Sequence, residues 1–495
     1  MKVIPKSHLI LLFVIILLGA FLRLDNLEHT SFQSHVIGDL ELAEKIADGT
    51  YFPLSGLTSG RHPYGVQQTF GPLFSYLLAI PLFVKDSYIF AVGFVAVLNI
   101  LAVMIAYKFI AEFFDPKTAL IGAAFYATNP WAIFFSDIMT NAFVVPFFSV
   151  LFIYCLFKFA ISKQDIYIIP AIILSALMLQ LHLGTLLLAI LLVLTILLFR
   201  RDLNIKYFIL GGLGGTITLL PYLYYNLTRG TIFAVLEHAA LPVAVESKTL
   251  ILEAIGIPAL LATNYFGKYI LGTARLFENS FANYYVLAIA SIIIGLLLLG
   301  GLHIFVNLRK DKYKLLLLWM ILPTVFFILL GKNVSPHFFI AIYPAQFILL
   351  GLVLGKFYDK AKSATILLIL ILLISNIAVI TGFYSVAARD GGTNGIYHGT
   401  YSAREEVAEF ILKDAQSQDI VIYGFEKGPN NAYRYILEKN KRIVNYKQIT
   451  NIEEMTNGYF IDDRYMITAR YLTEKEKEFG EYIEFRNIGI LGVTS

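Results

Sequence analysis

The sequence predicts an α-helical protein that crosses a membrane many times and carries a small α/β domain at its C-terminus. Composition is the first observation behind this prediction: the 495 residues are 58% hydrophobic and only 15% charged, with a mean hydropathy of +0.70. Soluble domains carry about a quarter charged residues, so this composition is typical of a membrane protein. Pattern is the second observation, because long apolar runs alternate with polar loops up to Tyr384, after which the chain becomes polar.

Charge and cysteine content exclude other classes. A net charge of +4 is too small to indicate a nucleic-acid-binding protein. The single cysteine, Cys155, falls inside an apolar run, so the sequence allows no intrachain disulfide and no cysteine metal site.

The apolar runs predict about eleven spanning helices, because about 17–25 apolar residues cross a bilayer as a helix. The first run follows Lys2 and Lys6 and lacks a small-residue cleavage site, so we expect an uncleaved signal-anchor helix. The run at 71–84 is too short to span and is expected to lie at the interface or to re-enter the membrane. The predicted spans are 7–24, 88–110, 118–135, 140–158, 166–182, 184–199, 207–225, 284–305, 315–331, 337–355 and 363–384.

Basic residues predict the orientation of these spans in the cell (plasma or inner) membrane. They fall at alternate ends of the spans, which the positive-inside rule assigns to the cytoplasm together with the N-terminus. The groups are Lys2/Lys6, Lys108/Lys117, Lys158/Lys163, Arg200/Arg201/Lys206, Arg309/Lys310/Lys312/Lys314 and Lys356/Lys360/Lys362. The loops at 25–87 and 226–283 and the tail then face outward.

Two domains are expected, a transmembrane domain at 1–385 and an outer-face α/β domain at 386–495. In the tail, Ser402 and Glu405 have the spacing of a capping box that opens a helix over 404–415. A buried strand at 419–425, a helix at 430–440 and a strand at 464–472 follow from their apolar periodicity.

Three acidic residues on the outer side are the candidate catalytic groups. Asp39 lies in an Ile-Gly-Asp turn, with Glu41 two residues later, before an amphipathic stretch. If that stretch is helical, Asp39 is either a simple N-cap or a rigidly held catalytic carboxylate. Asp137 lies where a span meets the outer surface, and it is either a helix cap or a functional group at membrane depth.

Basic and imidazole side chains on the outer side are candidates for binding a phosphate or another part of a substrate. An arginine offers a planar fork that suits a phosphate group, although loop arginines also contact lipid headgroups. A histidine can titrate near neutral pH, although most histidines at helix ends are simply hydrogen-bonded. These candidates are Arg61, His62, His182, Arg275, Lys332 and His337.

The succession of motifs resembles the GT-C superfamily of polyprenyl-phosphate-dependent glycosyltransferases, and most of all its branch related to protein O-mannosyltransferases and aminoarabinose transferases. The layout agrees over about 7–385 and the motifs over about 30–185. The motifs are GDLELAEKIADGTYFPLSG, the turn TSG, GPLFSYLLAIPLF, FFDPKTALIGAAFYATNP, the Asp137 loop and LQLHLGT.

This resemblance implies a GT-C fold with interfacial helices in the first outer loop and an active site beneath them. Asp39 would be the general base on the acceptor, and Asp137 would support the acceptor or a metal. The donor would be a sugar on a polyprenyl phosphate, the acceptor a lipid, glycan or protein, and the reaction inverting. Because a glycosyl phosphate already has a good leaving group, one base and nearby cations suffice. If a divalent cation is a cofactor, Asp39, Glu41 and Asp137 are its candidate ligands.

Two departures from the family pattern affect the site. Many relatives have adjacent acids where this chain has Asp39 and Glu41 separated by a leucine, and relatives carry a lysine that the segment Phe70–Leu73 lacks. Phosphate binding would then fall to Arg61 and next to Arg275.

Other functions remain open from the sequence. An oligosaccharyltransferase or glycan ligase on a similar scaffold would need a wider cavity and often a metal. A flippase or transporter for polyprenyl-linked glycans would be expected to carry charges inside its spans or an internal repeat, and neither is found. A non-catalytic scaffold presenting the tail would keep its function without Asp39.

Overall fold

A computed structural model describes residues 6–59, 68–200, 202–229, 247–266, 270–271, 280–330, 335–393, 397–415, 419–424, 431–463 and 472–493. Contacts divide the chain into two compact units. The helical unit comprises Met1–Asp25, Asp39–Tyr265 and Tyr284–Ile377, and the mixed unit comprises Asn26–Gly38, Phe266–Asn283 and Ala378–Ser495. The mixed unit therefore contains the predicted tail domain together with a segment that follows the first helix.

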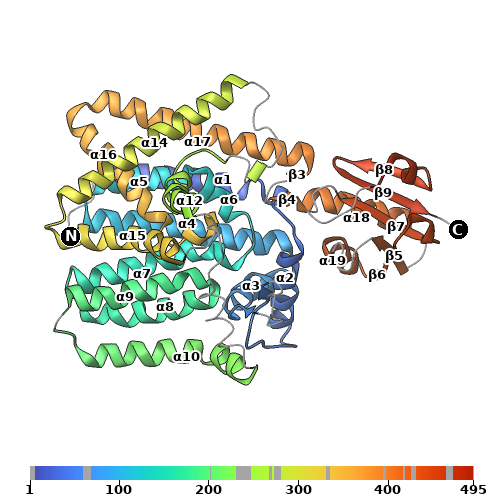
Figure 1. The fold of residues 1–495 in the computed structure, drawn as a ribbon, viewed down its shortest axis with the longest axis horizontal. Coiled ribbons are helices and arrows are strands. Elements are labelled where there is room, and N and C mark those ends of the chain that lie inside the picture. Colours follow the sequence, from blue (N-terminus) through green and yellow to red (C-terminus); the bar gives the residue numbers. More distant parts are fainter. Residues whose placement is uncertain are drawn as a thin grey trace. The chain divides into compact units, whose positions relative to one another are not determined.

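The predicted α-helical class is confirmed. The longer helices of the chain, with labels as in Figure 1, are α1 Lys6–Leu24, α2 Ser34–Ala47, α3 Leu73–Val84, α4 Tyr88–Phe113, α5 Pro116–Thr128, α6 Pro130–Ser136, α7 Val145–Ala160, α8 Ile168–Leu181, α9 Leu186–Phe199, α10 Ile205–Arg229, α12 Ser247–Leu261, α14 Ser280–Val306, α15 Asp311–Leu330, α16 Tyr343–Lys360 and α17 Lys362–Asp390. Each of the eleven predicted spans falls on helix over most of its length. Seven of the described helices are long and apolar enough to cross a membrane, and α8 and α9 are shorter apolar helices. The number of spans therefore stays a prediction.

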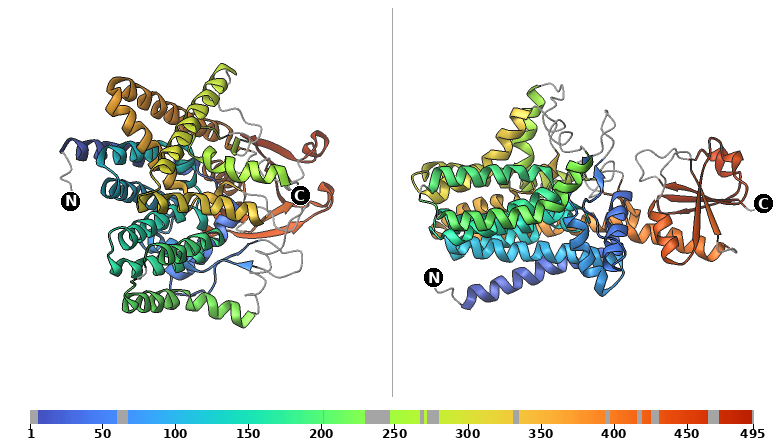
Figure 2. Two further views of the ribbon diagram at one scale, coloured as in Figure 1. Left: turned by 60° about the vertical axis from the view of Figure 1, so that its left-hand side comes forward. Right: turned by 90° about the horizontal axis from the view of Figure 1, so that it is seen from below.

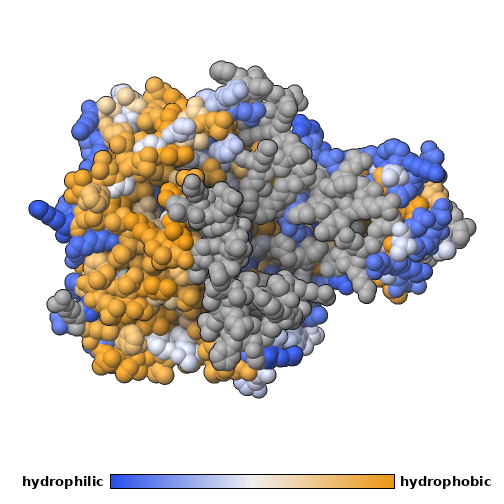
Figure 3. Space-filling view, viewed as in Figure 1, coloured by the Kyte–Doolittle hydropathy of each residue, from blue (hydrophilic) through white to orange (hydrophobic). Residues whose placement is uncertain are grey.

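Most helices of the helical unit lie side by side, with α4 packed on α5 and α7, and α8 packed on α7 and α10 (Figures 1 and 2). Figure 3 shows apolar side chains over the face of this bundle and hydrophilic ones at the end that holds the N-terminus. Apolar side chains of this unit such as Phe83, Leu213 and Leu329 are more than half exposed. An uncovered apolar surface of this kind is what lipid chains cover in a membrane.

One end of the bundle, here named the basic end, gathers the loops whose lysines and arginines predict a cytoplasmic location. Ion pairs join Lys158 to Glu112, Arg200 to Asp165 and Lys117 to Asp359 across neighbouring helices. The Lys312 ammonium donates to the Phe113 carbonyl at 2.8 Å. These contacts place the basic loops together, as the alternation of charge predicted, whereas the compartment they face stays a prediction.

Helix α5 packs closely against α16 through glycines. A β-carbon at Gly351 would collide with the Thr118 carbonyl oxygen, and one at Gly122 would lie 2.9 Å from the Phe347 carbonyl oxygen. Small residues of this kind let two helix backbones approach closely. Such packing matters in a membrane, where helices are not driven together by the hydrophobic effect.

We expect Gly351→Ala to destabilise the protein by about 1–3 kcal/mol, because the added methyl forces the two backbones apart. Thermal unfolding of the purified protein in detergent measures this effect. Gly301→Ala is the matched control, since a β-carbon at Gly301 on α14 meets no atom within 4 Å. Equal melting temperatures for the two variants would contradict the close approach.

Helices α5 and α6 are one predicted span that breaks at Asn129–Pro130. The Asn129 carboxamide oxygen accepts from the Ala132 backbone N–H at 3.0 Å and so caps α6, with Pro130 at its first position. The same oxygen accepts from the Tyr343 hydroxyl of α16, and the Asn129 amide donates to the Thr263 carbonyl at 3.3 Å. Tertiary partners thus hold the break in place.

The mixed unit contains a five-stranded sheet in the order β6-β5-β7-β9-β8. Strand β5 (Asp419–Gly424) pairs in parallel with β6 (Ile443–Gln448) and β7 (Gly458–Asp463), and β9 (Ile488–Val493) pairs antiparallel with β7 and β8 (Glu481–Phe485). Apolar side chains of these strands and their loops form one core, including Tyr423, Phe460 and Leu491.

The predicted strand at 419–425 and helix at 430–440 are confirmed as β5 and α19 (Asn431–Lys439). The predicted strand at 464–472 lies outside the described residues except for Leu472. The predicted capping box at Ser402 is wrong. The N-cap of helix α18 (Tyr401–Asp414) is Thr400, two residues before Ser402, because Thr400 is extended and its hydroxyl accepts from the Ala403 N–H at 3.3 Å.

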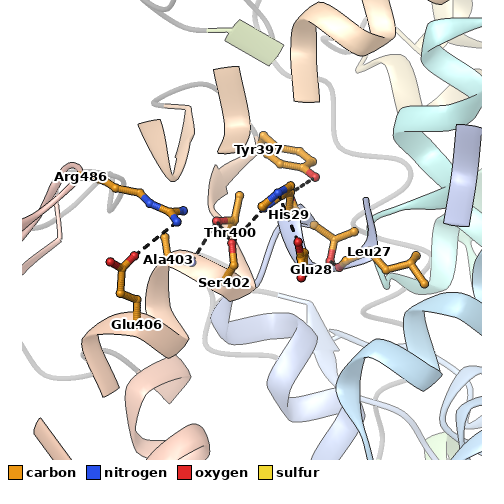
Figure 4. A network of polar contacts seen from close by, with 10 residues as sticks. Leu27, Glu28, His29, Tyr397, Thr400, Ser402, Ala403, Glu406 and Arg486 are labelled. Atoms are coloured by element: carbon orange, nitrogen blue, oxygen red, sulfur yellow. Dashed lines mark hydrogen bonds and ion pairs between the residues drawn. The ribbon is translucent and has the colours of Figure 1, made fainter. Parts of the chain in front are cut away.

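The segment Asn26–Gly38 is held by the start of α18 within the mixed unit (Figure 4). The Tyr397 hydroxyl donates to the His29 carbonyl at 2.7 Å, and the His29 ring lies 3.1 Å from the Ser402 hydroxyl oxygen. The Phe32 N–H donates to the Gly399 carbonyl at 3.0 Å, and the Arg404 guanidinium donates to the Phe32 carbonyl. Phe32 itself is fully buried, so this segment is an integral part of the unit.

Candidate active site

Asp39 is a buried carboxyl group in the second turn of α2. The helix begins at Ser34, so the interpretation of Asp39 as an N-cap is wrong. The side chain shares a helical face with Ala43, four residues on, which is fully buried, and Asp39 is only 9% exposed. Figure 1 shows the C-terminal part of α2 and α3 at the end of the bundle away from the N-terminus.

The surroundings of Asp39 contain no partner for a negative charge. Within the described residues, no hydrogen bond or ion pair reaches its carboxyl group. Burial therefore raises the pKa of Asp39 from 3.8 to about 7, because removal from water disfavours the charged form. Glu41, two residues later, points to a different face of the helix and is partly exposed. The two acids are thus unlike in environment, and the raised pKa of Asp39 lets it exchange a proton near neutral pH.

Asp137 is the C-cap of α6, at the other end of this short helix from Asn129, and it is buried. One carboxyl oxygen accepts from the Ser136 hydroxyl at 3.0 Å, and the other has no hydrogen-bond partner in the described part of the chain. Burial raises the pKa of Asp137 well above its ordinary value, while the Ser136 hydrogen bond and the positive charge of Arg23 oppose this rise.

Arg23, in the last turn of α1, is a buried residue that the sequence analysis did not single out. Its guanidinium donates to the carbonyls of Ala127 at 2.6 Å, Tyr126 at 3.2 Å and Gly19 at 3.0 Å. It therefore satisfies the last carbonyls of α5 just before the break, where no helical N–H is available. The only signal in the sequence is its place at the end of a predicted span, which is also typical of ordinary boundary arginines.

The structure brings His182 and His337 together from two loops. Their rings lie 5.5 Å apart, and each ring also contacts Phe338. His182 is buried and His337 is partly buried. Because His182 Nδ1 accepts from the Gly184 N–H at 3.1 Å, the neutral ring carries its proton on Nε2. The Nε2 proton of His182 is thus available to donate a hydrogen bond.

The remaining predicted residues, Arg61, His62, Arg275 and Lys332, lie outside the described residues. Among those described, no group of three or more His, Cys, Asp or Glu side chains is placed to hold a metal ion. In particular, Asp39 and Glu41 lie on different helical faces, and Asp137 belongs to another loop. The cation proposed from the sequence therefore has no preformed ligand set of these three residues.

The arrangement of helices is similar to that of solved structures of ArnT and of an archaeal oligosaccharyltransferase, so the resemblance to the GT-C superfamily is confirmed for the fold alone. ArnT from Cupriavidus metallidurans in the apo state is similar with a TM-score of 0.60 at 10% identity, over 98% of each chain. The same protein bound to undecaprenyl phosphate gives 0.56 at 11% identity, over 99% of this chain and 98% of that one.

A second solved fold relative is an archaeal enzyme. The oligosaccharyltransferase AglB from Archaeoglobus fulgidus, in complex with an inhibitory peptide and a dolichol-phosphate, is similar with a TM-score of 0.51 at 13% identity. The match covers 98% of this chain and 74% of AglB. No protein-family model matches the chain, and no curated protein sequence matches it.

Proposed function

We propose that the protein is a membrane glycosyltransferase that moves a sugar from a polyprenyl phosphate to an acceptor on the outer face of the membrane. Asp39 is the general base in this proposal, and the reaction inverts the anomeric carbon. The acceptor is a lipid, a glycan or a protein. Support comes from the shared fold, since the similar structures include one with undecaprenyl phosphate and one with a dolichol-phosphate.

The observation that carries the proposal is the environment of Asp39. A base that must take a proton from a hydroxyl at neutral pH works best when its own pKa lies near that pH. Asp39 has this property because it is buried and has no cationic partner among the described residues. A carboxyl group kept out of water without a partner costs stability, and such groups are concentrated at functional sites.

The chemical step balances with the groups named. Asp39 takes the proton of the acceptor hydroxyl as that oxygen bonds to the anomeric carbon from the face opposite the phosphate. The bond between the anomeric carbon and the phosphate oxygen breaks, and its electron pair leaves on the polyprenyl phosphate. No acid is needed to protonate the leaving group, because a phosphate is already stable as an anion.

The leaving phosphate gains charge and needs donors around it. Arg61, Arg275 and Lys332 are the proposed cations, with Arg61 the first choice. His182 and His337 join them as hydrogen-bond donors, since the proton of His182 is on the nitrogen that has no partner in the described residues. Glu41 and Asp137 are the proposed supporting acids, with Asp137 held by Ser136.

A transfer assay on the purified protein with a panel of polyprenyl-phosphate sugars tests the assignment. We expect Asp39→Asn to lower kcat by about 100-fold or more, since general-base catalysis contributes about 10²–10⁴ in rate. Asp48→Asn is the matched control, because Asp48 is exposed just after the same helix. Turnover by Asp39→Asn equal to that of the control would exclude Asp39 as the base.

The pH profile provides a separate prediction. Since only the ionised form of Asp39 accepts a proton, kcat/KM should rise with pH up to about 7 and level off above it. Rates measured with one donor between about pH 5 and pH 9 check this. A profile that is flat through this range, or that falls as pH rises to neutrality, would contradict the role.

An oligosaccharyltransferase or glycan ligase is the second candidate, and the similarity to AglB favours it specifically. The two functions differ in donor size and often in the need for a metal. Transfer from a donor with one sugar that survives treatment with a chelator supports the first candidate. Activity only with oligosaccharide donors, abolished by the chelator and restored by a divalent cation, supports the second. A flippase would move lipid-linked glycans without forming a new glycosidic bond.

A further inference from the structure

A pocket of about 330 Å³ opens at the basic end of the helical unit, between α5, α14, α15 and α16. The chain connections put it at the opposite end of the helices from Asp137, His182 and His337. Three lysines line it, Lys117, Lys310 and Lys356, against two aspartates, Asp115 and Asp359. Its wall thus carries a net positive charge.

Both aspartates of the pocket are already engaged. Asp359 forms an ion pair with Lys117. Asp115 is the N-cap of α5, where its carboxylate accepts from the Thr118 N–H at 2.9 Å and from the Thr118 hydroxyl at 2.6 Å. In the part of the chain that the structure describes, no carboxylate pairs with Lys310 or Lys356.

Lys356 is held in place by a neutral histidine. Its ammonium lies 2.7 Å from His303 Nδ1, and because an ammonium only donates, this nitrogen is an acceptor. The His303 proton is then on Nε2, which lies 3.4 Å from the Tyr313 hydroxyl oxygen. Asn307, the first residue after α14, donates to the His303 carbonyl at 2.9 Å. These contacts orient Lys356 without neutralising its charge, so the pocket is prepared for an anion.

The outward side chains of α14 beside the pocket are apolar. Leu302, Phe305 and Val306, in the last two turns of α14 beside His303, are 57%, 67% and 72% exposed. A cationic pocket directly beside an exposed apolar surface at the end of a bundle fits a molecule that is both anionic and acyl-chained. A free phosphate would use the lysines but not this surface.

We propose that this pocket binds the phosphate group of an anionic membrane lipid through Lys310 and Lys356, with the lipid chains along the exposed face of α14. Both ammonium groups donate charge-assisted hydrogen bonds to the phosphate oxygens. The site is separate from the proposed glycosyl-transfer chemistry and does not depend on it.

Binding of phosphatidylglycerol to the purified full-length protein, measured by native mass spectrometry, tests this proposal. Phosphatidylcholine with the same acyl chains is the lipid control. We expect Lys310→Gln/Lys356→Gln to bind phosphatidylglycerol about 30-fold more weakly, since each lysine near an anionic surface contributes about a factor of five. Lys310→Arg/Lys356→Arg should bind as the wild type does.

Lys360→Gln is the matched protein control, because Lys360 is exposed one turn beyond Lys356 and does not line the pocket. Lys310→Gln alone, at an exposed position, keeps the test valid if the double variant does not fold, and should bind about fivefold more weakly. Equal loss in Lys360→Gln, or wild-type binding by the glutamine variants, would overturn the proposal. The proposal would also be overturned if inorganic phosphate alone stabilised the wild type to the same extent as phosphatidylglycerol does, and if the glutamine variants lost this effect.

Discussion

Asp39→Asn is expected to unfold at a higher temperature than the wild type at about pH 8, although it should have lost its activity. The folded protein binds the Asp39 proton more tightly than the unfolded chain does, because burial raises the pKa from 3.8 to about 7. Stability therefore falls as pH rises from about 4 to about 7 and is constant above. Asparagine is neutral throughout, so it avoids this loss.

The size of the gain follows from the shift. At about 1.4 kcal/mol for each pKa unit, Asp39→Asn should gain about 4 kcal/mol at about pH 8 and about 2 kcal/mol at about pH 5. Thermal unfolding of the purified proteins at the two pH values measures the difference. Asp48→Asn, at an exposed position, should show no gain at either. If the stability gained by Asp39→Asn did not increase with pH, burial would not raise the pKa of the Asp39 carboxyl group in the folded protein.

Arg23→Met is expected to cost about 3–5 kcal/mol in stability, the largest loss that we predict for a single substitution in this chain. The methionine fills most of the volume but leaves the carbonyls of Tyr126 and Ala127 without the donor they have in the native protein. It also removes the positive charge that lowers the cost of the buried Asp137 carboxyl group. Thermal unfolding in detergent measures the loss.

A double-variant cycle separates these two causes. If Arg23 acts partly through Asp137, Arg23→Met/Asp137→Asn should be less destabilised than the sum of the single variants. Arg309→Met is the matched control, because Arg309 is exposed and its loss should change stability by less than about 0.5 kcal/mol. A melting temperature for Arg23→Met within error of the wild type would show that the three hydrogen bonds contribute little.

The helical class could be predicted from the sequence because a chain in lipid must satisfy its backbone hydrogen bonds internally. Apolar run length therefore locates helices well. It does not locate breaks such as Asn129–Pro130, which depend on the Tyr343 hydroxyl and the Thr263 carbonyl from distant parts of the chain. Apolar run length also does not locate the start of α2, since the local sequence at Gly38 and Asp39 is typical of a turn followed by a helix cap.

The sequence could predict which residues belong to the candidate site, but not how buried they are or which of them lie together. Asp39 was selected from its local pattern, yet its raised pKa comes from burial, which only tertiary packing decides. His182 and His337 were selected singly, and no spacing rule relates two loops so far apart. Arg23 was missed because it ends an apolar run. An arginine at such a place is expected to mark the end of a span, whereas Arg23 is a buried hydrogen-bond donor.

The place of Asn26–Gly38 in the mixed unit has a consequence for the order in which the protein is made. Phe32 and Arg404, which share a hydrogen bond, are 372 positions apart. At about 5–20 residues per second, a ribosome takes roughly 20–75 s to travel that distance. For all of that time the early segment waits without its partners while the spans between are being inserted. The segment around Gly399 and Arg404 thus completes a structure that Asn26–Gly38 began, and a chain released before this segment is made would leave Phe32 uncovered.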